Sequence, residues 1–292
     1  MSARSRFRLF KFPVKNQLHR FTRSKFGSFL FFAILISGGL FSVLPLVYCI
    51  TTSFKPLDEL LIFPPTLFTV KRPTIANYTA IPDLLSGLSV PITRYAFNSI
   101  FVSIIGTFLS VIISAMAAFV LSKTEMKFNK LIFTVVQFSL LFNAYTLSVP
   151  QYIVYSKIGI INTYLAYIVP AAASSMGVFL MKQYMDGYVP YALIEAAHID
   201  GAGWIGIFTR IVLPIVKPCV LTLVMFSFLG IWNSVPSGTI FSESLKTLPT
   251  VMSTIAAGGL ARSGSSMATS VILMIFPIAV YLISQGSIKE TM

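Results

Sequence analysis

Long apolar stretches with few charges constrain this sequence more than any other feature. A transmembrane helix needs about 20 mostly apolar residues, because each residue rises about 1.5 Å through a hydrocarbon core about 30 Å thick. Of the 292 residues, 55% are hydrophobic and 11% are charged, whereas soluble domains carry about 25% charged residues. Lipid tails offer no hydrogen-bond partners to backbone N–H and C=O groups, so only helices or closed barrels can span the hydrocarbon core. The stretches are continuous rather than alternating, which predicts helices.

The apolar pattern predicts an all-α, polytopic membrane protein with six transmembrane helices. The expected spans are 28–52, 95–121, 131–149, 163–181, 217–233 and 267–285. Residues 1–27 precede them as a basic tail, and residues 28–292 are expected to form a single transmembrane domain. Cys49 and Cys219 lie in or beside expected spans, which favours small buried hydrophobes over a disulfide.

The distribution of basic residues predicts the orientation. Eight of the 22 Lys and Arg lie within residues 1–27, where no acidic residue interrupts them. A cytoplasmic anchor explains this run more simply than nucleic-acid binding does, and the apolar segment behind it is longer than that of a cleaved signal peptide. With the N-terminus in the cytoplasm, the cytoplasmic segments hold 15 Lys and Arg and the outer segments hold 7. The positive-inside rule therefore predicts that both termini are cytoplasmic.

Two expected outer segments are long. Residues 53–94 contain six prolines, which favour extended or turn backbone. Residues 234–266 contain a Gly- and Ser-rich run at 256–266, whose composition predicts a mobile loop.

The longest expected cytoplasmic loop, residues 182–217, does not resemble a linker. Pro190 stands where a helix would begin, at the first helical position, and Tyr191–Ile199 is expected to be a short helix. Asp200–Gly201 predicts a break, since Asp can cap the next helix and Gly accepts a positive φ. Ala202–Val212 is expected to form a second short helix. Two short helices joined at a glycine would make a compact protrusion with an apolar face that needs a partner.

The segment EAAHIDGAGWIGIFTRIVLPIVKP, Glu195–Pro218, resembles the EAA loop of ABC-importer permeases. The family pattern is EAA, a DGA step, then F, I, LP and a further P. The residues that fit it are Glu195, Ala196, Ala197, Asp200, Gly201, Ala202, Phe208, Ile211, Leu213, Pro214 and Pro218.

The resemblance extends over most of the chain and points to the MalG-type carbohydrate permeases. The similar segments are Tyr95–Ser99, Ala117–Lys123 and Trp232–Asn233. Within that family, Lys55–Tyr78 and Ser284–Met292 resemble the branch that serves complex or acidic oligosaccharides, including alginate-type sugars.

The resemblance implies a type I importer fold in a bacterial inner membrane and a set of partners. These are a second related permease, two ABC ATPase subunits, an extracytoplasmic sugar-binding protein and membrane lipid. It implies that this chain is not an enzyme and binds no cofactor, while ATP and Mg are held by the ATPases. No nucleic-acid partner is expected.

The resemblance also implies roles for individual residues. The EAA loop would form coupling helices that enter a cleft on each ATPase. Coupling is expected to involve Glu195, Ala196, Ala197, Asp200, Gly201, Ala202, Phe208, Leu213 and Pro214. Glu195 would face a basic ATPase residue and Gly201 would be the hinge, although Glu195 taken alone would be read as a solvated helix residue. Gly258, Gly259 and Arg262 are expected near the tip of a loop that enters the binding protein; the alternative is a plain surface loop.

Polar residues within the expected spans are candidates for the substrate path. They are Asn98, Ser99, Gln137, Asn143, Tyr145, Trp232 and Asn233. Aromatic rings stack on sugar faces and amides bind hydroxyls, so this set suits a saccharide. The alternatives are hydrogen bonds between helices, or an interfacial anchor in the case of Trp232.

Several function classes are disfavoured by what the sequence lacks. It contains no G-x-x-x-x-G-K-[ST] phosphate-binding loop. His19 and His198 lie far apart, so no metal site is expected. An ion-driven secondary transporter would need intramembrane carboxylates, and all nine acidic residues fall outside the expected spans. An ABC permease for amino acids or a quaternary amine remains an alternative, and a membrane scaffold without transport activity has no specific support.

Overall fold

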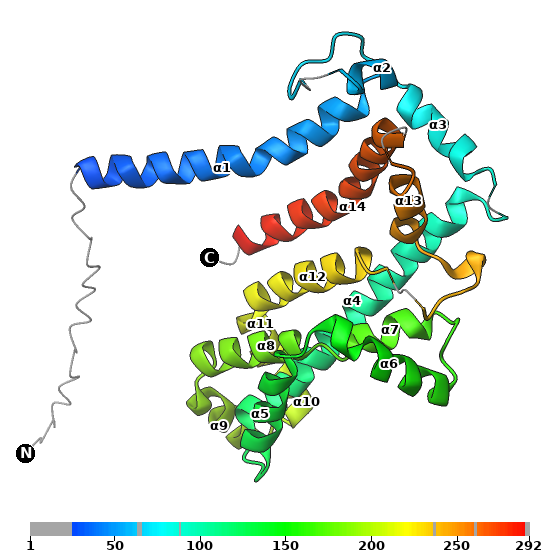
Figure 1. Cartoon of the computed structure of the whole chain (residues 1–292). Coiled ribbons are helices and arrows are strands. Elements are labelled where there is room, and N and C mark those ends of the chain that lie inside the picture. Colours follow the sequence, from blue (N-terminus) through cyan, green and yellow to red (C-terminus); the bar gives the residue numbers. More distant parts are fainter. Residues whose placement is uncertain (1–24, 63–65, 88, 236–237, 260–261, 290–292) are drawn as a thin grey trace, which may run out of the picture. The chain divides into compact units, whose positions relative to one another are not determined.

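The computed structural model describes residues 25–62, 66–87, 89–235, 238–259 and 262–289 (Figure 1). This described part is helical, and no strand occurs in it. Contacts divide the chain into two units, residues 1–47 and 48–292. Helix α1, Lys25–Ser53, runs across that boundary and covers the first expected span. Most of the basic tail 1–27 lies outside the described residues.

Helix α4, Ile92–Lys123, is the centre of the second unit. Three helices pack against it: α7, Leu165–Ala172; α8, Ser175–Tyr188; and α12, Lys217–Trp232. Small residues let these helices approach closely in lipid. A Cβ added to Gly177 of α8 would lie 2.4 Å from the Ser114 hydroxyl of α4, so only glycine fits there.

Four segments of the described chain are long and apolar enough to cross a membrane. They are Gly27–Ser53, Ile92–Lys123, Leu165–Tyr188 and Ser263–Gly286, the last belonging to α14, Ser263–Lys289. A fifth candidate joins Trp204–Ile215 to α12 across an 83° bend. These segments correspond to five of the six expected spans, and the count of six stays a prediction.

The third expected span, 131–149, differs from a continuous helix. It is divided between α5, Asn129–Ser139, and α6, Ala144–Ile158. The Asn143 carbonyl accepts the Leu147 N–H, which places Asn143 directly before α6, and Asn is a favoured residue at that position. Pro150 lies inside α6, so the segment after residue 149 is helical as well.

The expected outer loops contain more helix than their composition predicted. Helices α2, Leu57–Leu60, and α3, Ala76–Leu85, lie within the proline-rich segment. A 3₁₀ turn η2, Glu243–Leu245, and helix α13, Leu248–Ala256, occupy the later one. The prediction of a loop at 256–266 is wrong in its last part, because α14 begins at Ser263.

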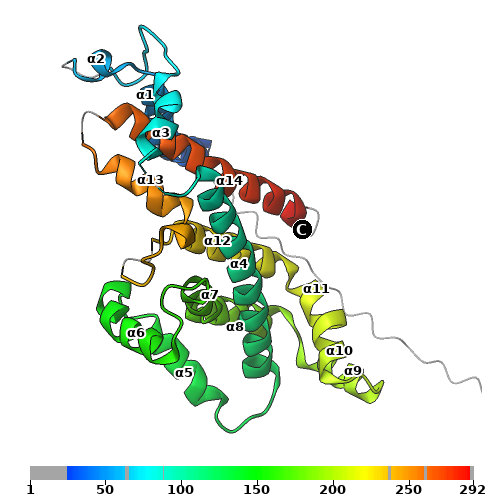
Figure 2. The same cartoon turned by 90° about the vertical axis from the view of Figure 1, so that its right-hand side faces the viewer.

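Helix α13 formed because it has a face to bury. Leu248, Val251, Met252 and Ile255 are all buried, at helical spacing, in a cluster with α3, α4 and α14. Figures 1 and 2 show α2, α3 and α13 at one end of the second unit and α5, α9 and α10 at the opposite end.

Candidate functional site

The connection between α8 and α12 is a chain of short helices, here called the α9–α11 loop, residues 189–216. It comprises α9, Tyr191–Ile199; α10, Trp204–Ile207; a π-helical turn η1, Phe208–Val212; and α11, Leu213–Ile215. Pro190 precedes the first residue of α9 with φ −66° and ψ 142°, so its expected place inside that helix is wrong by one residue. Pro214 and Pro218 stand in the first turns of α11 and α12, where a missing N–H costs little.

A left-handed glycine turns the chain between α9 and α10. Gly201 has φ +80°, and its N–H donates to the His198 carbonyl at 3.0 Å. The Ala202 N–H donates to the Ala197 carbonyl at 2.9 Å. A positive φ costs most residues strain that glycine avoids, which is why helices commonly end this way. Asp200 ends α9 rather than capping α10, whose N-cap is Gly203, so the expected capping role is not seen.

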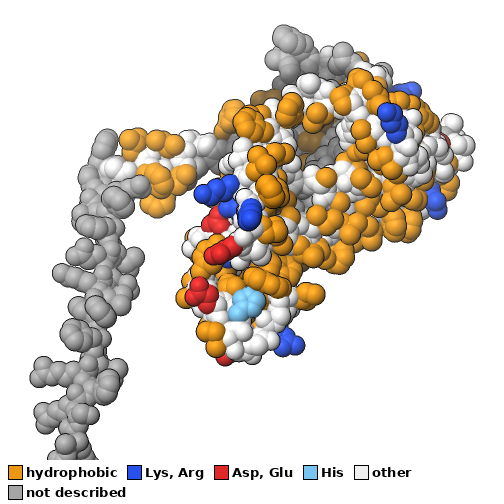
Figure 3. Space-filling model, turned by 90° about the horizontal axis from the view of Figure 1, so that it is seen from below, with side chains coloured by type: hydrophobic (Ala, Val, Ile, Leu, Met, Phe, Trp, Pro, Cys, Tyr) orange, Lys and Arg blue, Asp and Glu red, His pale blue; other side chains and the backbone are white. Residues whose placement is uncertain are grey.

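The tip of the α9–α11 loop leaves large apolar side chains uncovered. Ile199 is 86% exposed and Ile205 is 81% exposed, and the adjacent Trp204 is 47% exposed. Glu195, Ala196, Asp200 and Pro214 are also exposed, whereas Ala202, Phe208 and Leu213 are half-buried. Figure 3 looks onto this end, where hydrophobic side chains lie among charged ones. Such a surface is typical of a contact site for a protein partner.

Beneath the tip, the α9–α11 loop is anchored by apolar packing. Ile194 and Ala197 of α9 are buried, and Ile207, Val212 and Val216 are fully buried. They form one cluster with residues of α4, α8 and α12. Because close-packed interiors transmit displacement with little compression, the loop and the helices beneath it form a stiff unit.

Aromatic rings reinforce this anchorage. Phe119 of α4 lies 6.0 Å from the Trp204 ring and 5.3 Å from the Phe208 ring, measured between centroids. The Trp204 ring in turn meets His198 of α9 edge-on at 4.4 Å. Both halves of the loop are therefore joined through one tryptophan to the last turns of α4.

A cavity of about 650 Å³ opens between α4, α6, α7, α8 and α12. Its polar lining includes Ser110, Gln151, Tyr155, Tyr167, Ser174, Ser227, Ser234 and Thr239. The Ser110 and Ser227 hydroxyls are 3.1 Å apart and hydrogen bonded across α4 and α12. Among the described lining residues none is Lys, Arg, Asp or Glu. Hydroxyls and aromatic rings without charge suit a hydroxyl-rich, uncharged ligand.

The candidate path residues lie elsewhere. Asn98, Gln137, Asn143, Trp232 and Asn233 are not among the described residues that line the cavity. Gln137, Asn143 and Asn233 are exposed. The Tyr145 side chain lies outside the described part of the structure. A substrate role for these residues stays a prediction, and the residues of α6, α7 and α8 that line the cavity were missed because hydropathy does not show which faces meet.

Trp232 is almost fully buried and links two helices. Its ring lies 5.7 Å from Phe228 on the same helix and 5.0 Å from Phe276 of α14. The ring therefore packs between α12 and α14, but its Nε1 has no hydrogen-bond partner among the described residues, so the expected hydrogen bond between helices is not seen.

Asn98 ties α4 to a segment far along the chain, residues 239–248, here called the outer segment after the side of the membrane on which it is expected. Its amide nitrogen donates to the Ser244 carbonyl at 2.8 Å and to the Lys246 carbonyl at 2.9 Å. Its oxygen accepts the Tyr164 hydroxyl at 2.7 Å. Asn98 is fully buried, so its whole amide is used inside the protein. The next residue, Ser99, accepts the Leu248 N–H at 2.6 Å.

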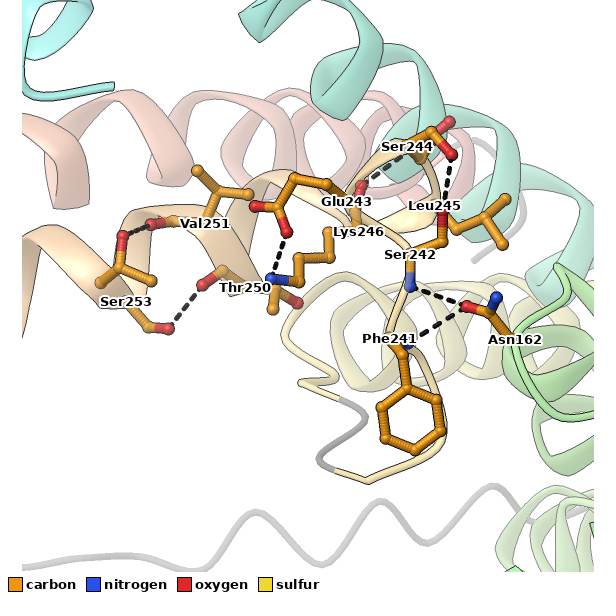
Figure 4. Close-up of polar contacts among 12 residues, drawn as sticks. Asn162, Phe241, Ser242, Glu243, Ser244, Leu245, Lys246, Thr250, Val251 and Ser253 are labelled. Atoms are coloured by element: carbon orange, nitrogen blue, oxygen red, sulfur yellow. Dashed lines mark hydrogen bonds and ion pairs between the residues drawn. The ribbon is translucent and has the colours of Figure 1, made fainter. Parts of the chain in front are cut away.

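A second asparagine holds the other half of the outer segment. The Asn162 oxygen accepts the Phe241 N–H at 3.1 Å and the Ser242 N–H at 2.8 Å (Figure 4). The Asn162 N–H donates to the Thr239 carbonyl at 2.9 Å, and its φ is +58°. Sequence reasoning missed Asn162, although Asn between two short helices is a frequent occupant of the left-handed region. In Figure 4 the outer segment continues into α13 beside the Glu243–Lys246 ion pair.

Gly258, Gly259 and Arg262 are together at the turn between α13 and α14. Gly259 has φ +70°, and its carbonyl accepts the Arg262 N–H at 3.1 Å. A Cβ on Gly258 would meet the Arg262 side chain at 2.2 Å, so that side chain folds over the glycine. All three residues are exposed. Residues 260–261 of this expected tip lie outside the described residues.

The acidic residues of the described chain do not gather in the membrane helices. Asp186, however, lies in the last turns of α8, inside the span Leu165–Tyr188 and not beyond it as expected. It pairs with Lys182 at 2.6 Å and accepts the Ser122 hydroxyl at 2.5 Å. Within the described residues, no three His, Cys, Asp or Glu side chains are placed to hold a metal.

Comparison with known proteins places the chain among transport permeases. No family model matches the sequence. LplC of Bacillus subtilis is 34% identical over 207 residues, which cover 68% of this chain and 65% of LplC, just under two thirds of that relative. The arabinooligosaccharides transport system permease protein AraQ of Halalkalibacterium halodurans is 31% identical over 222 residues, which cover 73% of this chain and 76% of AraQ.

A solved structure has a similar fold. It is the crystal structure of a bacterial ABC transporter involved in the import of the acidic polysaccharide alginate. One of its chains matches with a TM-score of 0.71 at 18% identity, over 90% of this chain and 98% of that chain. At this identity the match shows the fold.

Proposed function

Because this chain belongs to the permeases of ABC sugar transport systems, we propose that it is one of two permease subunits of an importer that carries an oligosaccharide inward across a bacterial inner membrane. The α9–α11 loop carries this proposal. It is a stiff protrusion with an uncovered apolar tip, and it rests on the helices that surround the cavity. A subunit without a phosphate-binding loop needs such an element to transmit the movement of a separate ATPase to its own helices.

The orientation follows from the distribution of basic residues. Both termini lie in the cytoplasm, so the α9–α11 loop faces the cytoplasm and the turn between α13 and α14 faces outward. Two ATPases bind ATP and Mg below the membrane, one against each permease. A sugar-binding protein delivers cargo from outside, with Gly258, Gly259 and Arg262 near its docking site. This chain holds no cofactor and catalyses no reaction itself.

The tip of the α9–α11 loop supplies complementary contacts to the ATPase. The exposed Ile199, Trp204 and Ile205 fill an apolar groove, and the exposed Glu195 carboxylate pairs with a basic residue at its rim. Gly201 keeps α9 and α10 at a fixed angle because only glycine holds φ +80° without strain. ATP-driven closure then displaces a stiff element that has two discrete positions.

The cavity between α4, α6, α7, α8 and α12 forms this subunit's share of the translocation path. Serine, glutamine and tyrosine groups bind sugar hydroxyls, and aromatic rings cover sugar faces. The described lining has no cation to balance a uronate, which favours a neutral sugar on this side of the path. AraQ, named for arabinooligosaccharides, is consistent with such a cargo.

Reconstitution tests this function directly. The chain would be placed in proteoliposomes with the second permease, the ATPases and the binding protein of the same transport system. Uptake of labelled arabinotriose, an alginate trisaccharide, glutamine and glycine betaine would be measured with and without ATP. We expect ATP-dependent uptake of a sugar. Uptake of glutamine or betaine alone would assign another cargo class, and uptake driven by an ion gradient without ATP would overturn the proposal.

A further inference from the structure

The last residue of α4, Lys123, is buried although it carries an ammonium group. It is 4% exposed, and Nζ donates to the Val189 carbonyl at 2.7 Å. Nζ also lies 4.6 Å from the centroid of the Tyr191 ring. A lysine at the end of a span ordinarily extends its ammonium to the headgroups. Lys123 instead directs its ammonium to the backbone that enters α9, so the charge interacts with groups inside the protein.

Neighbouring groups complete this connection. The Tyr191 hydroxyl donates to the Ser122 carbonyl at 2.5 Å, and the Ser122 hydroxyl donates to Asp186 of α8. The ends of α4 and α8 and the start of α9 are thereby joined by four side chains, here called the α4 clamp: Ser122, Lys123, Asp186 and Tyr191. Partly buried networks of this kind hold one arrangement when every member is satisfied.

The other half of the α9–α11 loop contacts the same helix end. The Phe119 ring packs against Trp204 and Phe208, one turn before Lys123. Both α9 and α10 are therefore attached to the last five residues of α4. Further along, α4 presents Ser110 to the cavity. A displacement of the loop has a continuous, close-packed route to the cavity wall.

We propose that Lys123 is a positioning residue that couples the α9–α11 loop to α4, so that movement of the docked loop shifts the helix lining the cavity. This inference rests on the proposed function, since it needs an ATPase that moves the loop. Apolar packing sets the overall position of the loop, and the ammonium adds a directional constraint, since a charge-assisted hydrogen bond and a cation–π contact fix the start of α9 in register on α4. Removing the charge would remove this constraint and loosen the movement of α9 from that of α4.

The first experiment measures coupling in the complete reconstituted importer. Lys123→Met keeps the length of the stem and removes the charge, Lys123→Arg keeps the charge, and the exposed Lys127→Met is the matched control. Uptake of labelled arabinotriose and of the alginate trisaccharide is divided by ATP hydrolysed. We expect Lys123→Met to lower uptake per ATP about tenfold, the size of losing one charge-assisted hydrogen bond. Lys123→Arg should restore most of it, and Lys127→Met should change nothing.

The second experiment reports position rather than activity. Spin labels at Ala192 of α9 and Glu125 beyond α4, both exposed, are introduced after replacement of Cys49 and Cys219. In the parent complex their separation should be the same with and without ATP, because the two elements move together. Lys123→Met should make the separation depend on ATP. If Lys123→Met does not insert, Tyr191→Phe, which removes only the bond to Ser122, should give a smaller change of the same kind.

The outcomes separate this inference from the function on which it rests. A parent complex without ATP-driven uptake would overturn the importer function. A parent complex that transports, together with a Lys123→Met variant of normal uptake per ATP, would overturn the positioning role alone. A Lys123→Met variant whose uptake and hydrolysis fall in proportion, at a constant label separation, would mean that Lys123 is a structural anchor and would also overturn the role.

Discussion

The two ends of residues 48–292 combine apolar packing and hydrogen bonds in different proportions. The α9–α11 loop rests on an apolar cluster and leaves Ile199 and Ile205 uncovered. In the outer segment 239–248, backbone carbonyls accept hydrogen bonds from Asn98, and backbone N–H groups donate to the oxygen of Asn162. A surface that binds a partner exposes apolar side chains, and a layer of buried side chains beneath supports them. A segment whose backbone is bonded within the protein does not need a partner for those hydrogen bonds.

Asn98→Leu should have the largest effect on stability, because it removes the amide that joins α4 to the outer segment. It removes the hydrogen bonds from the Asn98 amide to the Ser244 and Lys246 carbonyls and from the Tyr164 hydroxyl to the Asn98 oxygen. Each lost hydrogen bond costs about 0.5–1.5 kcal/mol, although Arg94 still donates to the Ser244 carbonyl and the Tyr164 hydroxyl. We expect the lowest midpoint of thermal unfolding in detergent among these variants, with ATPase copurification retained at low temperature. The exposed Asn233→Leu is the control. An unchanged midpoint would show that the Asn98 hydrogen bonds do not stabilise the outer segment.

Gly201→Val should come next, and it tests the opposite end. A β-branched residue at φ +80° stores strain of about 1–3 kcal/mol. Part of this is relieved by local rearrangement of the exposed turn, so we expect a smaller fall in the unfolding midpoint than for Asn98→Leu, but loss of ATPase copurification and uptake. Gly203→Val is matched, since Gly203 has φ −74° and open space around it. Equal behaviour of the two variants would exclude a special role for the turn at Gly201.

Asn162→Gly tests the hydrogen bonds at the other half of the outer segment. Glycine accepts φ +58° but offers no oxygen to Phe241 and Ser242. Two exposed hydrogen bonds are lost, so we expect a decrease of about 1–2 kcal/mol in the free energy of unfolding. Asn162→Asp keeps the acceptor and should retain most of that stability. Faster proteolysis within residues 239–248 should accompany the glycine variant alone.

Glu195→Gln should have the smallest effect on stability, within about 0.5 kcal/mol, because the side chain is exposed. Its effect on association should be clear, since the charge that faces the ATPase is removed. We expect weaker ATPase copurification at low salt and a smaller dependence on added salt than in the parent protein. Identical salt curves for both proteins would show that Glu195 is only solvated.

Much of the architecture could be predicted from the sequence because it depends on local properties. The expected spans match helices α1, α4, α7–α8, α12 and α14, since hydropathy over about 20 residues decides insertion. The third expected span is divided between α5 and α6, because hydropathy does not register a break before an asparagine. Helix α13 was missed because its nine residues lie within the segment 234–266, which was expected to be a loop.

The sequence by itself determined the membrane character, the glycine turn at Gly201 and the family resemblance of Glu195–Pro218, since each depends on residues close together in the chain. Only the tertiary structure decided the cavity, the α4 clamp and the outer segment's hydrogen bonds. The Leu248 N–H and the Ser99 hydroxyl are 149 residues apart in sequence and 2.6 Å apart in space. Such contacts depend on which helix faces meet. Helix packing in lipid decides which faces meet, and hydropathy does not.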